Sequence, residues 1–134
     1  MISLQVATTR REDILDVTDM VAQTLRELGS GEGVAVVAVP HCTCGLYLNE
    51  NESGLVHDTL ALLRELSARG SWRHDEIDNN AGAHLAATLL GNAVMVPVAQ
   101  GRLRLGTWQR IMLVELDGPR QRQLTVSLLS EQAG

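Results

Sequence analysis

Apolar and polar positions alternate at both ends of the chain, as they do in half-buried β-strands. Ile2, Leu4 and Val6 alternate with polar side chains, which predicts a strand over about residues 2–8. Residues 122–129 alternate in the same way and predict another strand. Between them lies the nearly all-apolar VAVVAVP, residues 34–40, which predicts a central strand buried on both faces. Further strands are expected at 93–98, at 102–105 and, as a long strand, at 108–116; residues 45–49 form either another strand or the continuation of the 34–40 strand beyond a bend at Pro40. In the 93–98 segment, a proline indicates an edge strand or a bulge.

Two other segments, residues 18–28 and 53–68, carry apolar residues at the spacing of amphipathic helices, and a short third helix is expected at residues 79–90. Thr18 and Ser53 are the expected N-caps of the first two, and Asn79 or Asn80 is expected to start the third. A glycine follows the first and the third, where helices commonly end. The pattern offers few parallel crossovers. It therefore predicts an α+β fold: a compact single domain over residues 1–134, with an antiparallel-rich sheet packed with about three helices.

Composition adds that aliphatic side chains must fill the core. Of the 134 residues 45% are apolar but only 2% are aromatic, and none is Phe. The net charge of −5 and the few aromatics argue against a nucleic-acid partner. All eleven basic side chains are arginines, and five cluster late in the chain: Arg102, Arg104, Arg110, Arg120 and Arg122. We interpret this cluster as a solvated strand face with ion pairs rather than a phosphate-binding patch.

The sequence favours a cytoplasmic protein. No apolar run approaches 18 residues, so no membrane span is expected, and the N-terminus lacks the apolar core of a signal peptide. Cys42 and Cys44 are expected to remain unbonded to each other, which fits the reducing cytosol. We interpret both as packing residues rather than as nucleophiles or ligands.

Three of the four histidines lie in polar, constrained surroundings. His41 follows the apolar 34–40 strand, and His74 and His84 bracket the acidic stretch HDEIDNNAGAH. Converging imidazoles are the usual means by which a small protein holds zinc. The alternative for His41 is a ring satisfied by a backbone carbonyl, and the ten-residue spacing of the other two is not specific by itself. His57, on the second predicted helix, is expected to be a surface residue.

Carboxylates and amides near these histidines are candidates for acid–base chemistry and binding. Glu50 follows a predicted strand in the polar loop NENE, which is otherwise a plain turn. Asp58 lies one turn into a helix, where the dipole alone explains a carboxylate. Asp78 could be a ligand, a proton carrier or a group that orients an imidazole. The segment GTWQ, residues 106–109, could wall a pocket or form a turn followed by a buried Trp.

The motifs HCTCGLYLNEN, DNNAGAHLAATLLG, VPVAQGRLRLGTWQ and ELDGPRQRQLTV, together with Asp58 and His74, occur in an order that resembles the YjbQ-like family. That family is described either as uncharacterised or as secondary thiamine-phosphate synthase. The resemblance covers about residues 2–130. It implies a compact α+β fold, a homotrimer, and a metal-capable site made of His41, His74 and His84. Other positions that match the family are Asn49, Glu50, Asp58, Asp78, Asn79, Trp108, Gln109, Arg120 and Arg122. His57 does not match, and the chain departs at Cys42 and Cys44, where the family more often has Thr and Ala.

The activity implied by the resemblance joins a pyrimidine diphosphate to a thiazole phosphate with loss of pyrophosphate. Three imidazoles suit zinc better than the magnesium that usually accompanies diphosphate chemistry. Our first hypothesis is therefore an enzyme with a divalent metal, expected to be zinc, and a small phosphorylated or anionic substrate. Catalysis is assigned to Glu50, Asp78 and Asp58, and substrate binding to Asn49, Asn79, Trp108, Gln109, Arg120 and Arg122. The alternative is a non-catalytic metal-binding or structural trimeric module, since no obvious nucleophile or cofactor motif is present.

Overall fold

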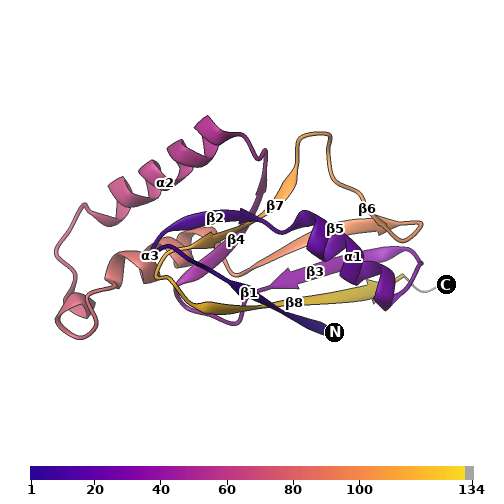
Figure 1. The fold of residues 1–134 in the computed structure, drawn as a ribbon, viewed down its shortest axis with the longest axis horizontal. Helices are drawn as coiled ribbons and strands as arrows, with labels where there is room; N and C mark the ends of the chain where they lie inside the picture. The colour runs from indigo at the N-terminus through magenta and orange to yellow at the C-terminus, as the bar shows by residue number, and fades with distance from the viewer. Residues whose placement is uncertain (132–134) are drawn as a thin grey trace.

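The computed structural model describes residues 1–131 and forms two antiparallel sheets with three α-helices (Figure 1). Its strands are β1 (Ile2–Ala7), β2 (Asp13–Asp16), β3 (Gly33–Ala38), β4 (Cys44–Asn49), β5 (Ala93–Ala99), β6 (Arg102–Leu103), β7 (Arg110–Glu115) and β8 (Gln121–Ser130). Its helices are α1 (Thr18–Leu28), α2 (Ser53–Ser67) and α3 (Ala81–Leu90), with the 3-10 turn η1 (Arg73–Glu76) before α3. The predicted α+β class, with its antiparallel strands and three helices, is confirmed.

The two sheets divide the strands unequally. The larger sheet has the order β1-β8-β3-β5-β6 and the smaller one β2-β7-β4, with every neighbouring pair antiparallel. The strand β8 is the longest and pairs with β1 on one side and β3 on the other. Since β3 ends at Ala38, opposite Thr125, the first residues of β8 extend past the end of β3. Over residues 121–124, the edge of β8 that faces β3 is therefore not paired with a strand.

The main core lies between the two sheets and is aliphatic, as the composition requires. Leu46, Ile111 and Leu113 of the small sheet meet Val37 and Val126 of the large one, and all five are essentially inaccessible to water. The opposite face of the small sheet packs against α2 and α3 through a second cluster that includes Met112, Val114, Leu63 and Ala86. The helix α1 covers the rest of the inner face of the large sheet. The small sheet is thus a middle layer, and α3 is held on it with its C-terminal end close to the start of β4.

Three details of the sequence prediction are wrong for local reasons. Thr18 is the first residue of α1 and not its cap, because its hydroxyl accepts the N–H of Ile111 at 2.7 Å. The N-cap of α2 is Glu52, whose carboxylate accepts the N–H groups of Gly54 and Leu55, so Ser53 does not cap. The strand β3 is central, but only one of its faces is buried, since its alternate residues are half-exposed.

That outer face of the large sheet is uncharged across β1, β8, β3 and β5. Paired residues in register point to the same side, which assigns to this face Val34 and Val36 of β3 and their partners Pro97 and Met95 of β5. Leu129 of β8, the partner of Val34, is also on this face and is 61% exposed. Within residues 1–131 the helices pack on the inner face and on the small sheet, which leaves this surface uncovered.

Candidate functional site: a histidine-lined cavity beside α3

His74 and His84 are brought together at the start of α3. Their ring centroids are 4.6 Å apart and the ring planes are inclined by 76°, an edge-to-face contact. The turn η1 carries His74, and α3 carries His84 on its second turn. Asp75 fixes the junction between these elements, because its carboxylate accepts the N–H of Ala81 at 2.9 Å. Two of the three predicted imidazoles are therefore in contact.

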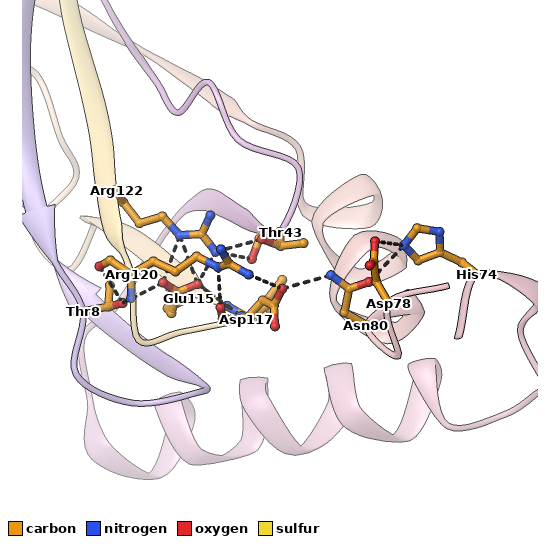
Figure 2. Close-up of polar contacts among 10 residues, drawn as sticks. Thr8, Thr43, His74, Asp78, Asn80, Glu115, Asp117, Arg120 and Arg122 are labelled. Atoms are coloured by element: carbon orange, nitrogen blue, oxygen red, sulfur yellow. Dashed lines mark hydrogen bonds and ion pairs between the residues drawn. The ribbon is translucent and has the colours of Figure 1, made fainter. Parts of the chain in front are cut away.

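A chain of hydrogen bonds determines which nitrogen of His74 carries its proton (Figure 2). The amide nitrogen of Asn80 donates to a carboxylate oxygen of Asp117 at 3.0 Å, so the amide oxygen of Asn80 must face the other way. This oxygen lies 2.9 Å from Nε2 of His74. Nε2 is therefore the protonated nitrogen, and Nδ1 keeps a free electron pair in the neutral ring. Such outer partners commonly orient a ligating imidazole.

Asp117 is suited to anchor this chain because it stays ionised. Burial by itself would raise the pKa of the Asp117 carboxyl, but hydrogen bonds from Asn80 and Arg120 outweigh burial and hold the pKa below its ordinary value. Arg120 donates to Asp117 through both its side-chain Nε, to the carbonyl, and Nη2, to the carboxylate. The aspartate therefore accepts from both sides, which keeps Asn80 in one orientation.

His41 is held by a hydrogen bond that its Nε2 accepts, whereas Nε2 of His74 donates one. It follows β3, and its Nε2 accepts the backbone N–H of Gln123 in β8 at 2.8 Å. The predicted alternative was a ring satisfied by a backbone carbonyl, and the observed partner is a backbone donor instead. Burial, and after it the positive charge of Arg122, lowers the pKa of His41, which favours a neutral ring.

His41 and His84 face a common cavity of about 390 Å³ between the loop after β3 and the helix α3. Cys42, Thr88 and Asn92 are among its other lining residues. Across the described residues 1–131, no group of three or more His, Cys, Asp or Glu side chains is arranged to hold one metal ion. Of the three predicted histidines, His41 and His84 line this cavity, whereas His74 contacts His84 from outside its lining.

The two cysteines beside this cavity are free thiols. Cys42 is exposed, whereas Cys44 is buried, and burial raises the pKa of the Cys44 thiol to about 11. A thiol with so high a pKa is neither a good nucleophile nor a ready metal ligand near neutral pH. The interpretation of Cys44 as a packing residue fits this environment.

Behind the cavity lies a buried ion pair that the sequence prediction missed. Arg122 is 4% exposed and Glu115 is 0% exposed, and the guanidinium donates to the carboxylate through Nε and Nη2 (Figure 2). Nη2 of Arg122 also donates to the carbonyl and hydroxyl oxygens of Thr43, in the loop that leads from His41 to β4. The prediction of a solvated arginine face is therefore wrong for Arg122. The alternation along β8 could have predicted this burial, because Arg122 is on the same, inward-facing side of the strand as Leu124 and Val126.

Arg110 and Arg120 form ion pairs, as predicted for the late arginines. Arg110 donates to Asp16 at 2.7 Å and to Asp19 at 3.2 Å. Burial alone would raise the pKa of Asp16, but hydrogen bonds, that from Arg110 first among them, outweigh burial and lower it. The same hydrogen bond raises the pKa of Arg110. Arg120 is 53% exposed and pairs with Asp117. These ion pairs are partly exposed and structural in character.

Four predicted site residues lie at the far end of β4 from the cavity: Asn49, Glu50, Trp108 and Gln109. Cys44 begins β4 beside the cavity and Asn49 ends it, so these two residues are roughly 16 Å apart at about 3.3 Å per residue. Gln109 accepts the N–H of Gly106 at 2.8 Å and closes a turn. Trp108 in that turn is 71% exposed, so the predicted buried Trp is wrong.

The remaining predicted residues are dispersed over the helical side. Asp78 has an oxygen 3.8 Å from Nε2 of His74 (Figure 2). Asn79 adopts a positive φ of 54° and lines a separate hollow of about 310 Å³ between α2 and α3. Asp58 is exposed on α2, where it pairs with His57, also exposed as predicted. Of the three predicted catalytic carboxylates, therefore, only Asp78 lies next to a histidine of the site within one chain.

These features define a class: an α+β domain of two antiparallel sheets with a histidine-lined cavity beside its last helix. The family model described as "UPF0047 protein YjbQ-like" matches residues 2–131. The chain belongs to this family, as its motifs predicted.

Relatives and solved structures agree with this assignment. A UPF0047 protein of Archaeoglobus fulgidus is 46% identical, with 94% of this chain and 98% of that protein covered. The UPF0047 protein YugU of Bacillus subtilis is 35% identical, with coverages of 95% and 97%. The crystal structure of a protein of unknown function from Sulfolobus solfataricus superposes with a TM-score of 0.93 at 43% identity, covering 97% of this chain and 96% of that one. Within residues 1–131, no helix has the length and apolar character needed to cross a membrane.

Proposed function

We propose that this chain is a metal-dependent enzyme for a small anionic substrate, with its site at the cavity between His41 and His84. The contact of His74 with His84 carries the proposal. Nδ1 of His74 has a free electron pair, since Nε2 donates to Asn80, and imidazole nitrogens suit zinc. A zinc ion bound here would supply a Lewis acid that polarises a substrate oxygen.

The set of ligands is incomplete within one chain in this arrangement. Catalytic zinc sites generally use three protein ligands, and the histidine pair provides two. His41, the third ligand of the sequence prediction, can coordinate only after its Nε2 gives up the N–H of Gln123. Asp78, next to His74, is the nearest of the predicted carboxylates and is assigned the proton-transfer role.

The substrate class follows from the resemblance to secondary thiamine-phosphate synthase, which would bring phosphate groups to the site. Of the two predicted arginines, Arg122 is buried against Glu115 and has no reach to a substrate. Arg120 is half-exposed and lies on the same hydrogen-bonded chain as His74. We therefore assign phosphate binding to Arg120 and not to Arg122.

A homotrimer is part of the proposal, because the uncharged outer face of the large sheet suits burial against further copies of this chain. Association would also bear on the predicted residues at the far end of β4. Glu50, Asn49, Trp108 and Gln109 lie too far from the cavity to act there within one chain, so they can join it only from a neighbouring copy. Asp58 is exposed on α2, where it pairs with His57, and does not line the cavity.

Metal content tests the enzyme proposal most directly. Protein purified without added zinc should carry metal in the wild type and in His57→Ala, which alters an exposed histidine outside the cavity. His84→Ala should lose most of it. Equal metal content in the wild type and His84→Ala would refute the ligand assignment.

The uncovered sheet face also favours a second candidate, a structural trimeric module without turnover. A chelator would then dissociate the oligomer, as measured by light scattering, and no substrate would be turned over in a manner sensitive to Glu50→Gln. A trimer that persists in chelator excludes a metal staple. Turnover that Glu50→Gln abolishes would favour the enzyme.

A further inference from the structure

The unpaired start of β8 determines the state of His41. In the large sheet, β3 stops at Ala38, opposite Thr125, while β8 begins four residues earlier at Gln121. On its other side Gln123 is in register with Gln5 of β1. The N–H of Gln123 points to the side that β3 has left, where the imidazole of His41 takes the place of a strand.

A backbone N–H can only donate, so Nε2 of His41 contributes its electron pair to this bond. The neutral ring then carries its proton on Nδ1, and a protonated ring nitrogen cannot bind a metal. His41 is thus the reverse of His74, whose proton is on Nε2 and whose free pair is on Nδ1.

From these opposite tautomers we infer that His41 is a hydrogen-bond donor to an oxygen of an anionic ligand in the cavity, and that the metal is held without it. The cavity has about 390 Å³, room for a phosphate-sized group beside His84. His74 and His84 then supply ligand atoms, and His41 supplies an N–H to the substrate oxygen. The inference rests on the proposed function for the metal, but the tautomer of His41 is independent of it.

The tautomers can be measured without metal or activity. In ¹⁵N-labelled, metal-stripped protein, two-dimensional NMR of the imidazole nitrogens should show a protonated Nδ1 for His41 and a protonated Nε2 for His74. Asn80→Ala should release His74 to a mixture of tautomers and leave His41 unchanged. A proton on Nε2 of His41 in the wild type would overturn the inference.

His41→Gln separates the donor from the ligand role. The glutamine amide oxygen can still accept the N–H of Gln123, so the sheet edge stays satisfied, but the donor at the Nδ1 position is lost. Binding of inorganic phosphate, followed by NMR titration, should weaken roughly tenfold or more, and zinc content should stay at the wild-type value. Loss of zinc in His41→Gln would make His41 a ligand and overturn the inference. A wild-type His41 ring unaffected by phosphate would do the same. Retained zinc in His84→Ala would instead refute the proposed function.

Discussion

Arg122→Met tests the claim that a buried ion pair holds the loop of His41 in place. Methionine keeps the apolar stem of the side chain but removes every hydrogen bond that Arg122 donates to Glu115 and to Thr43. Glu115 would retain only the hydroxyl of Thr8 and two backbone N–H groups while remaining inaccessible to water. An unpaired buried charge costs about 3–5 kcal/mol, so the free energy of unfolding should fall by that amount at pH 7.

The assay is urea unfolding at one fixed protomer concentration, because association would add a concentration-dependent term. Arg120→Met is the matched control: it removes a half-exposed guanidinium from Asp117 and should cost less than about 1 kcal/mol. The double variant Glu115→Leu/Arg122→Met should be more stable than Arg122→Met, since no buried charge remains. If Arg122→Met costs no more than Arg120→Met, the reasoning on burial is wrong.

The dependence on pH provides a second test of the same pair. Burial alone would raise the pKa of Glu115, but hydrogen bonds from Arg122 and Thr8 outweigh it and hold the pKa below the ordinary 4.5. In the wild type this contribution is present above pH 4.5 and is lost as the pH falls further. In Arg122→Met burial dominates and raises the pKa of Glu115. The difference in free energy of unfolding between the wild type and Arg122→Met should therefore shrink as the pH is lowered from 7 towards 5.

Three further substitutions test local features by thermal or urea unfolding. Thr18→Val leaves a buried backbone N–H of β7 without its acceptor and should cost about 1–3 kcal/mol, whereas Thr18→Ser should be close to neutral. Gly45→Ala would put a methyl group 2.9 Å from backbone and side-chain atoms of α3 and its end, so it should cost about 1–3 kcal/mol. Gly31→Ala adds its methyl group in open space and should leave the free energy of unfolding almost unchanged. Glu52→Ala removes the cap of α2 and should cost about 0.5–2 kcal/mol, and a larger effect from Ser53→Ala would contradict the capping assignment.

The sequence predicted most of the fold because periodic burial leaves a periodic pattern. Residues 2–8 and 122–129 alternate because one face of β1 and of β8 packs into the core. The helix α3 was recognisable from the asparagines before it and from Gly91 at its end. The caps were predicted less well. A Thr or Ser at a helix start has the same local sequence whether its hydroxyl caps the helix or, as with Thr18, accepts from a distant strand.

For the site, the sequence provided the residue types and the order of the family motifs, and these suffice to place the chain in its family. It also indicated that His74 and His84 belong to one polar stretch. Local sequence cannot reveal the partner of each ring nitrogen, because those partners come from distant segments. Asn80 is bound to Asp117, 37 residues away, and His41 to Gln123, 82 residues away. Only the packing of β8 beyond the end of β3 made His41 an acceptor, since an unpaired backbone N–H at that edge requires one.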